Sequence, residues 1–547
     1  MSTKLVLFAV DDPDQCKQWK RRLRRAHYEV LTVGNFEDAL SGVQEDYFHL
    51  AVIDIDLRDN MGMSRGLELA ARVQASVHPV PWIAIGDPEY EVVRRVYEDL
   101  KAYGFFPRGA LDAADEVMKK IDEAFDKEIQ CNFQLRISPV PEEDVLDRMI
   151  DGLELGQVDL TNWKIRAKLR QEIKDLLGKL FRRDYQIDII PLIPGYSGAG
   201  VRLVLPYRII DDVLRRCPSV VVKYGEISKI LSESKNYDKY VSSLIPSAHR
   251  PEMIKVKTTS HLGGVLYHFA GIPLEEANDL HRAYLSRKGS IDQQVHRVYL
   301  ILEDLFLKTF EHWRESRPPK TRLNVREEYL ERLISPAKLQ AGFEETFPKW
   351  KSQRLLELDE LGGLKLKTFV YELMGQEFKE VMGYVTITHG DLNGRNILLH
   401  EHLTERGDVA YVTTVIDFYH TGMGHILRDF IKLESYIKLE SLKTEDWEAL
   451  NAFEEALNSP TQLSLDDLGP IQRYDDLVKA YHVIWKLRAL AASWTGEPWE
   501  WIRDEYYIGL FYQTLAMLQY GIGDARKKLA LLSANKIHDL LSHKLAD

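Results

Sequence analysis

Hydrophobic and polar positions alternate regularly over the first 126 residues. Short apolar runs, typical of buried strands, alternate with longer runs in which apolar residues recur at helical spacing. Five strand–helix units of this length predict a doubly wound α/β domain with a five-stranded parallel sheet. The expected strands are Leu5–Val10, Tyr28–Val33, His49–Asp54, Trp82–Ile85 and Gly104–Pro107, and the helices between them include 14–26, 63–75 and 89–101.

The pattern changes twice in the rest of the chain. Residues 127–183 are charged and mostly helical, and a Pro139-Val140-Pro141 break precedes the helical text, so we expect a helical linker there. Residues 184–270 are rich in strand-like runs. Residues 271–547 are mostly helical, except for one predicted strand pair. We therefore expect a domain at 1–126, the linker, and an α+β region whose two parts meet near residue 270.

Composition narrows the class of protein. There are 72 Lys and Arg against 84 Asp and Glu, a net charge of −12, whereas a generic nucleic-acid-binding protein carries a basic excess. Cys16, Cys131 and Cys217 are too few and too scattered for a disulfide framework or a cysteine-rich zinc site. There is no apolar run of about 18 residues and no cleavable signal pattern. We expect a cytoplasmic protein with no membrane span and no nucleic-acid partner.

Acidic residues end two predicted strands of the first domain. Asp11 and Asp12 follow the first strand, and Asp54 ends the third. Ligands of a doubly wound sheet gather beyond the carboxyl ends of its strands, so these side chains should converge. Clustered carboxylates repel one another unless a hard cation lies among them, and oxygen ligands suit Mg²⁺. A carboxylate beside such a cation can act as a nucleophile toward phosphorus.

Residues 1–126 resemble the response-regulator receiver family. The matching text is VDD at 10–12, LAVIDIDLRDN at 50–60 and GLELA at 66–70. The resemblance implies that Asp54 is the phospho-acceptor of a phosphorelay and that Asp11 and Asp12 bind the metal ion. It also implies a histidine kinase as phosphodonor and a surface through which the chain could form homo-oligomers.

The receiver-like sequence departs from the family pattern at two positions. The family expects Thr or Ser at the end of the fourth strand, where this chain has Gly86. It expects Lys at the end of the fifth strand, where this chain has Arg108, and Arg is not equivalent to Lys. Two interpretations therefore stay open: a receiver that is phosphorylated on Asp54, and a degenerate receiver that serves as a docking or dimerisation surface.

The segment THGDLNGRNILL at 388–399 carries the clearest chemistry. Strand-forming residues flank a polar loop with Asp391 and Asn396, and a second apolar run leads to Asp417. Transfer of a γ-phosphoryl group needs an orienter for the acceptor hydroxyl and charge neutralisation by Mg²⁺. Asp391 can accept the hydroxyl proton. The amide oxygen of Asn396 and the carboxylate of Asp417 can hold Mg²⁺.

This part of the chain, residues 185–435, resembles the aminoglycoside phosphotransferase branch of the protein-kinase-like fold. HGDLNGRN fits the HxDxxxxN loop of that family, with Asp391 and Asn396 in register, and IDF at 416–418 fits its metal-binding segment. Asp429 matches the residue that braces the catalytic loop. The resemblance implies ATP and Mg²⁺ as cofactors and a two-lobed fold, with the N-lobe at 184–270 and a mostly helical C-lobe at 271–547.

The N-lobe should supply the nucleotide contacts. A turn between two strands contains Ser197, Gly198 and Gly200, and backbone N–H groups of such a turn can approach phosphate oxygens. By the resemblance, Lys223 at the end of the next strand contacts the α- and β-phosphates. It is expected to pair with a Glu on the following helix, for which Glu233 is preferred over Glu226.

The segment GGVLYHFAG at 263–271 resembles the connector between the lobes. In that family, backbone groups of the connector hydrogen-bond the adenine of ATP. The resemblance therefore assigns nucleotide contacts to the backbone near Tyr267 and Phe269.

Three functions remain open. The first is an ATP-dependent phosphotransferase coupled to a two-component receiver in signal transduction, whose acceptor is an unidentified hydroxyl of a small molecule or protein. The second is a non-catalytic, nucleotide-binding signalling scaffold with a pseudo-receiver. The third is an antibiotic-modifying phosphotransferase, which the appended receiver disfavours. The set Asp391, Asn396 and Asp417 favours the first, because a scaffold has no need of it, and residues 127–180 would then couple receiver and kinase.

Overall fold

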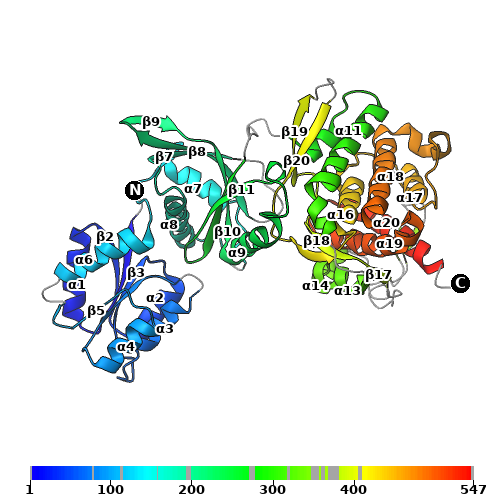
Figure 1. Cartoon of the computed structure of the whole chain (residues 1–547). Coiled ribbons are helices and arrows are strands. Elements are labelled where there is room, and N and C mark those ends of the chain that lie inside the picture. The colour runs from blue at the N-terminus through cyan, green and yellow to red at the C-terminus, as the bar shows by residue number, and fades with distance from the viewer. Residues whose placement is uncertain are drawn as a thin grey trace. The chain divides into compact units, whose positions relative to one another are not determined.

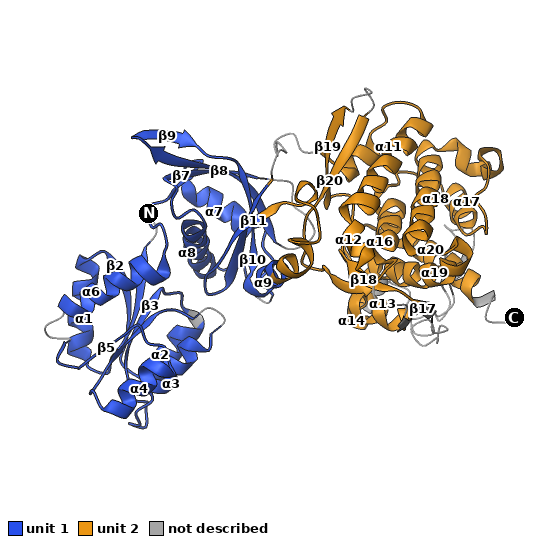
Figure 2. Ribbon diagram, in the orientation of Figure 1, with its two compact units in different colours: residues 1–234, 253–268 blue, residues 235–252, 269–547 orange. Residues whose placement is uncertain are grey.

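The computed structural model divides into two compact units (Figure 2). Unit 1 comprises residues 1–234 and 253–268, and unit 2 comprises residues 235–252 and 269–547. The structure describes residues 3–543 except 77–78, 111–114, 157, 192–198, 270–277, 317–320, 347–355, 359–363, 367–380 and 404–408.

The N-terminal part of unit 1 is a parallel five-stranded sheet covered by helices (Figure 1). Its strands are β1 (Lys4–Ala9), β2 (Tyr28–Val33), β3 (Leu50–Asp54), β4 (Trp82–Ile85) and β5 (Gly104–Phe106). Its helices are α1 (Pro13–Arg25), α2 (Phe36–Glu45), α3 (Gly66–Gln74), α4 (Tyr90–Glu98) and α6 (Asp115–Ala124), followed by a π-helical turn, η1 (Phe125–Ile129).

The strand order β2-β1-β3-β4-β5 is a doubly wound order, so the predicted receiver fold class is confirmed. Every residue of the central strands β3 and β4 is buried, as expected for parallel strands with both faces covered. One core contains Trp19 of α1 and Ile121 of α6, and the other contains Leu69 of α3 and Val96 of α4. The observed strands differ from the predicted ones by at most one residue at either end.

The rest of unit 1 is built on a second, mostly antiparallel sheet in the order β11-β12-β10-β8-β7-β6, with β9 paired to β8. The strands are β6 (Arg136–Ser138), β7 (Gln186–Pro191), β8 (Gly200–Ile210), β9 (Val213–Arg216), β10 (Val220–Glu226), β11 (Glu252–Thr258) and β12 (Leu262–His268). The helices are α7 (Glu142–Ile150), α8 (Trp163–Leu180) and α9 (Ile227–Asn236), the last of which runs into unit 2.

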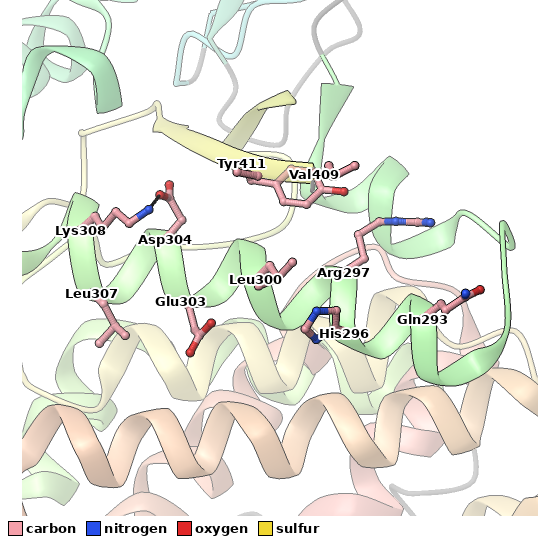
Figure 3. A pocket seen from close by; sticks show the side chains of 11 residues that line it. Gln293, His296, Arg297, Leu300, Glu303, Asp304, Leu307, Lys308, Val409 and Tyr411 are labelled. Atoms are coloured by element: carbon pink, nitrogen blue, oxygen red, sulfur yellow. Dashed lines mark hydrogen bonds and ion pairs between the residues drawn. The ribbon is translucent and has the colours of Figure 1, made fainter. Parts of the chain in front are cut away.

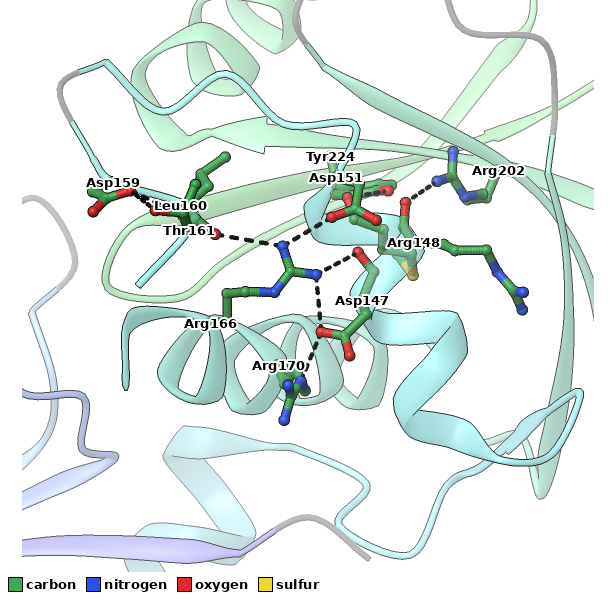
Figure 4. Close-up of polar contacts among 11 residues, drawn as sticks. Asp147, Arg148, Asp151, Asp159, Leu160, Thr161, Arg166, Arg170, Arg202 and Tyr224 are labelled. Atoms are coloured by element: carbon green, nitrogen blue, oxygen red, sulfur yellow. Dashed lines mark hydrogen bonds and ion pairs between the residues drawn. The ribbon is translucent and has the colours of Figure 1, made fainter. Parts of the chain in front are cut away.

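Helices α7 and α8, which lie in the segment expected to be a linker, pack against this second sheet. Met149 of α7 and Ile173 and Leu176 of α8 share a buried core with Val204 of β8 and Val222 of β10. Polar contacts reinforce the packing (Figure 4). The guanidinium of Arg166 lies 2.8 Å from Asp151 and 3.1 Å from Asp147, whose carboxylate also accepts from Arg170. The helical segment is therefore part of the same folded body as the sheet.

Unit 2 is mostly helical. Its first half contains η2 (Tyr237–Val241), η3 (Ser247–His249), β13 (Asn278–Asp279), α10 (Leu280–Leu285), α11 (Ile291–Asp304), η4 (Leu305–Thr309), α12 (Glu311–Glu315), β14 (Thr321–Leu323), α13 (Val325–Leu333), α14 (Pro336–Thr346), β15 (Leu356–Leu358), β16 (Leu364–Leu366) and β17 (Val381–Gly383). The second half contains β18 (Val385–Thr388), β19 (Ile397–Leu403), β20 (Val409–Val415), β21 (Gly422–His425), α16 (Arg428–Tyr436), η7 (Ile437–Ser441), α17 (Trp447–Leu457), η8 (Leu465–Arg473), α18 (Asp475–Thr495), α19 (Trp499–Ala516), η9 (Met517–Gln519) and α20 (Asp524–His543).

Helices α16, α18, α19 and α20 form the centre of unit 2 (Figure 1). Their buried aromatic residues include Tyr436, Tyr506, Phe511 and Tyr512, whereas Trp501 is exposed. An antiparallel sheet with α9, followed in the chain by a helical unit with short strand pairs, is the two-lobed kinase-like architecture expected from the sequence. The fold class is therefore confirmed for this region too. None of the described helices is both long and apolar enough to cross a bilayer.

Candidate functional site

The loop between β18 and β19 in unit 2 is hydrogen-bonded to helix α16. Strand β18 pairs with β21, and β19 pairs with β20. The carboxylate of Asp429, in the first turn of α16, accepts hydrogen bonds from the N–H groups of His389 (2.7 Å) and Gly390 (2.9 Å). Gly390 has a φ of 82°, and a Cβ there would lie 2.4 Å from the carbonyl oxygen of His420. Asp429 thus fixes the backbone that precedes Asp391.

Asp391 lies in this loop between an ammonium group and two amides. The Nζ of Lys432 is 2.9 Å from its Oδ1. The Nδ2 of Asn396 donates to its carbonyl oxygen at 2.8 Å and lies 3.4 Å from Oδ2, as does the Nδ2 of Asn393. Partial burial opposes ionisation of Asp391, but Lys432 outweighs it and lowers the pKa of the carboxyl below its usual range. Asp391 is therefore ionised at neutral pH.

Asn396 and Asp417 are held close in register by the β19–β20 hairpin. The N–H of Ile416 donates to the carbonyl of Asn396 at 3.1 Å, and the Nε2 of His389 lies 2.9 Å from the carbonyl of Ile416. Asp417 has a φ of 70°, a conformation that costs a non-glycine residue about 1–3 kcal/mol and is enriched at functional sites.

The donor atoms of this pair suit a hard cation. Because Nδ2 of Asn396 is engaged with the loop, its amide oxygen is the atom that could bind a cation. An amide oxygen and the carboxylate of Asp417 are the kinds of ligand that Mg²⁺ takes. The residues present therefore fit a magnesium ion. No group of three or more His, Cys, Asp or Glu side chains with metal-site geometry occurs among the described residues.

In unit 1, Lys223 and Glu233 form a buried ion pair. The Nζ of Lys223, on the central strand β10, is 2.6 Å from an oxygen of Glu233 on α9. The hydroxyl of Tyr267 on β12 donates to the other oxygen of Glu233 at 2.9 Å. Glu226, the other candidate, accepts instead from Ser228 on the exposed side of the chain. The structure thus brings together three of the residues singled out in the sequence.

The positions of the other residues predicted to bind nucleotide neither support nor oppose that role. Ser197 and Gly198 lie outside the described residues. Gly200 begins β8, and a Cβ there would lie 2.1 Å from the ring of Tyr224, so close packing already requires glycine at this position. Phe269 is a buried residue of unit 2, whereas Tyr267 belongs to unit 1.

The acidic cluster of the receiver-like domain contains its own cation, Arg108. One guanidinium nitrogen lies 2.9 Å from Oδ1 of Asp54 and 2.9 Å from Asp56, and the same Oδ1 accepts from the N–H of Asp56. Burial is the largest influence on Asp54 and, although Arg108 opposes it, raises the pKa of the carboxyl from 3.8 to about 6. Asp12 caps α1 by accepting from two backbone N–H groups. Arg108 therefore already pairs with the carboxylate of Asp54, the predicted phospho-acceptor.

Gly86 lies at the end of β4, where the receiver family has a hydroxyl-bearing residue. A Cβ at Gly86 would lie 2.3 Å from Cγ1 of Ile55, a buried residue that follows Asp54. The isoleucine thus fills the space in which a Thr or Ser side chain would start. The two departures from the family pattern, Gly86 and Arg108, are both built into the packing around Asp54.

Two contacts at these sites are not apparent from the sequence. Lys432 belongs to no motif, although its spacing from Asp429 places both on one face of a helix. The resemblance assigns only backbone contacts to the connector, so it does not predict the hydrogen bond from the hydroxyl of Tyr267 to Glu233. Neither contact can be derived from local sequence, since each joins segments that are distant in the chain.

A cavity of about 1000 Å³ lies elsewhere in unit 2, between α11 and β20 (Figure 3). Its lining includes Arg297, Glu303 and Lys308 of the α11 region and Tyr411 of β20. It contains none of the residues predicted for the phosphotransfer site.

Comparison with protein families gives one match. The model of ternary complex associated domain 9 matches residues 324–516, a stretch that contains the loop at 389–396 and helix α16. No curated protein matches the chain in sequence.

Comparison with solved structures gives matches that each cover part of the chain, among them these three. A response regulator receiver domain protein from Methanospirillum hungatei is 24% identical, covers 23% of this chain and 99% of its own, and has a TM-score of 0.20. A thermostable mutant of an aminoglycoside phosphotransferase is 12% identical, with 65% and 94% covered and a TM-score of 0.29. A glucosamine kinase is 13% identical, with 65% and 94% covered and a TM-score of 0.31.

Proposed function

We propose that the chain is an ATP-dependent phosphotransferase that is coupled to its receiver-like domain. The observation that carries the proposal is the loop around Asp391. Asp429 braces its backbone, Lys432 keeps Asp391 ionised, and Asn396 ties the loop to the hairpin that leads to Asp417. A chain that had lost phosphotransfer would have no reason to retain all of these contacts.

Each residue has a role that its chemistry allows. Asp391 orients the acceptor hydroxyl and takes its proton, and Asn396 and Asp417 hold Mg²⁺ on the phosphates. Lys223, fixed by Glu233, binds the α- and β-phosphates of ATP. The acceptor is the hydroxyl of a small molecule or of a protein.

Nucleotide binding tests this assignment before any acceptor is known. We expect the full chain to bind ATP more tightly with Mg²⁺ than without it, and Asp417→Asn to remove most of that difference. Asp211→Asn is a matched control, because Asp211 is an exposed carboxylate in a turn. Calorimetric titration that detects no ATP binding by the wild type would sink the proposal.

The proposed coupling rests on helix α8. It carries two buried acidic residues, one that contacts the receiver-like domain and one that contacts the second sheet. Asp175 is fully buried and lies 3.0 Å from Nε2 of His49, whose Nδ1 accepts from the N–H of Leu5 in β1. Glu172, also buried, accepts from the hydroxyl of Thr259 and lies 2.6 Å from Nδ1 of His261.

The second of these contacts leads to the helix that carries Glu233. The carbonyl of His261 accepts from the N–H of Ile227, the first residue of α9, at 3.2 Å. A Cβ at Gly263 would lie 2.8 Å from Ile230, so the same turn also packs closely on α9. A movement of the receiver-like domain would therefore reach the Lys223–Glu233 pair through α8.

The second candidate, a nucleotide-binding scaffold with a pseudo-receiver, is favoured by the surroundings of Asp54. Arg108 occupies Oδ1, and Ile55 fills the space beside Gly86. Treatment with phosphoramidate, a small phosphodonor, tests which of the two receivers is present. The intact mass of the treated protein shows whether a phosphoryl group has been added. A gain of one phosphoryl group that Asp54→Asn abolishes supports a phosphorylated receiver and a histidine kinase as its donor. No gain supports the pseudo-receiver.

A further inference from the structure

Helix α16 presents two side chains, those of Asp429 and Lys432, to the Asp391 loop. Asp429 and Lys432 are three residues apart and so share one face of the helix. Asp429 accepts from two backbone N–H groups of the loop, whereas Lys432 places its Nζ 2.9 Å from Oδ1 of Asp391. The same helix thus fixes both the backbone and the carboxylate.

The contact with Lys432 makes the two oxygens of Asp391 unequal. Oδ1 carries the ion pair with the ammonium group. Oδ2 is 3.4 Å from the amide nitrogens of Asn393 and Asn396, at the outer limit of hydrogen bonding, so it retains capacity for another donor. The side chain of Asp391 is 32% exposed and that of Lys432 only 18%, so a ligand can reach the carboxylate more readily than the ammonium.

Lys432 lies on a helix that a buried ion pair joins to α18. Two residues further along α16, the fully buried Glu434 binds the fully buried Arg488 of α18 at 2.6 Å. Burial alone would lower the pKa of Lys432, but Asp391 raises it above its ordinary value, so the ammonium stays charged.

We propose that Lys432 is a positioning residue of the phosphotransfer site: by binding Oδ1 it fixes the carboxylate of Asp391 and directs Oδ2 to the acceptor hydroxyl. The inference rests on the proposed phosphotransferase function. Lys432 would thus fix the orientation of Asp391, in addition to the contacts that Asn396, Asp417 and Lys223 would make with the metal ion and the phosphates. A displacement of about 1 Å at such a group can cost about 10²-fold in rate.

The test measures ADP release by the full chain, with MgATP as substrate and water as the acceptor hydroxyl. We expect Lys432→Met to lower kcat by about 10²-fold and to change KM for MgATP by less than about twofold. Lys432→Arg, which keeps a cation at this position, should have a kcat at least about tenfold higher than that of Lys432→Met. Lys432→Gln replaces the Met variant if that variant does not fold, and it should lose kcat to a similar extent.

A buried lysine in the next helical turn provides the control. Lys438 pairs with the fully buried Glu454 of α17, away from the loop, at 2.7 Å. The double variant Lys438→Met, Glu454→Gln removes that pair together and should shift the melting temperature while kcat is retained.

The outcomes separate the inference from the function on which it rests. A wild type that releases ADP with a kcat equal to that of Lys432→Met overturns the positioning role. So does a Lys432→Met variant in which kcat falls only as far as the folded fraction falls. A wild type that neither binds MgATP nor releases ADP overturns the phosphotransferase itself, and the role of Lys432 with it.

Discussion

At the scale of single residues, Asp54 has the most perturbed carboxyl pKa among the described residues of the receiver-like domain. Its folded-state pKa is raised from 3.8 to about 6, so the folded protein holds this proton more tightly than the unfolded chain does. Stability from this group is therefore complete below pH 3.8 and is lost as the pH rises through 6. At neutral pH the ionised Asp54 is a cost that Arg108 offsets only in part.

Asp54→Asn should consequently stabilise the domain at pH 8 by about 1–3 kcal/mol, and the gain should vanish toward pH 4. Urea unfolding at both pH values measures it. Asp56→Asn is the control, because Asp56 shares Arg108 but is half-exposed. Destabilisation by Asp54→Asn at pH 8 would show that Arg108 makes the ionised form favourable after all.

Gly86 gives a second residue-scale prediction. Gly86→Thr must displace Ile55 and should cost about 1–3 kcal/mol of unfolding free energy. Combining it with Ile55→Ala should cost less than the sum of the two single changes, by about 1 kcal/mol or more, because each variant relieves the other. Strict additivity in urea midpoints would mean that the two side chains do not compete for one space.

At the scale of elements, α8 carries the prediction for the coupling path. Its Glu172 hydrogen-bonds His261 and thereby raises the pKa of that histidine above 6.5, so the interaction stabilises the fold fully below pH 6.5 and is lost as the pH rises through the folded value. Glu172→Gln should remove this dependence. Thermal unfolding between pH 6 and pH 9 checks it, with His261→Asn as the matched variant. An unchanged pH profile in Glu172→Gln would contradict the assignment.

The elements also show what the sequence could and could not reveal. The receiver strands were predictable because buried parallel strands are apolar throughout and end at acidic or turn residues, as β3 does at Asp54. The pairing of Lys223 with Glu233 followed from the family resemblance. The burial of Glu172 and Asp175 did not, because acidic residues on a charged helix are usually exposed and only tertiary packing gives them partners.

The loop around Asp391 illustrates the same limit. Asp391, Asn396 and Asp417 stand in a recognisable order along the chain, so the sequence could propose them as site residues, and their roles stay a prediction. The contact of Lys432 with Asp391 depends on how α16 crosses the loop, and no local pattern encodes it. The space beside Gly86 is likewise filled by Ile55, which follows the neighbouring strand β3. In both cases the missing information is the packing between segments.

At the scale of the whole molecule, the proposed function makes a receiver-like domain and a kinase-like module serve one phosphotransfer reaction. Unit 1 holds the receiver-like sheet, α8 and the Lys223–Glu233 pair, and unit 2 holds the Asp391 loop. In the proposed reaction, Asp391 is the residue on which the chemistry depends most.

Release of ADP from MgATP by the full chain is the most direct measurement. If the proposed function is correct, we expect turnover by the wild type, a loss of about 10²-fold or more in Asp391→Asn, and a rate like that of the wild type in Asp211→Asn. Equal ADP release by the wild type and Asp391→Asn, or none from either, would contradict it.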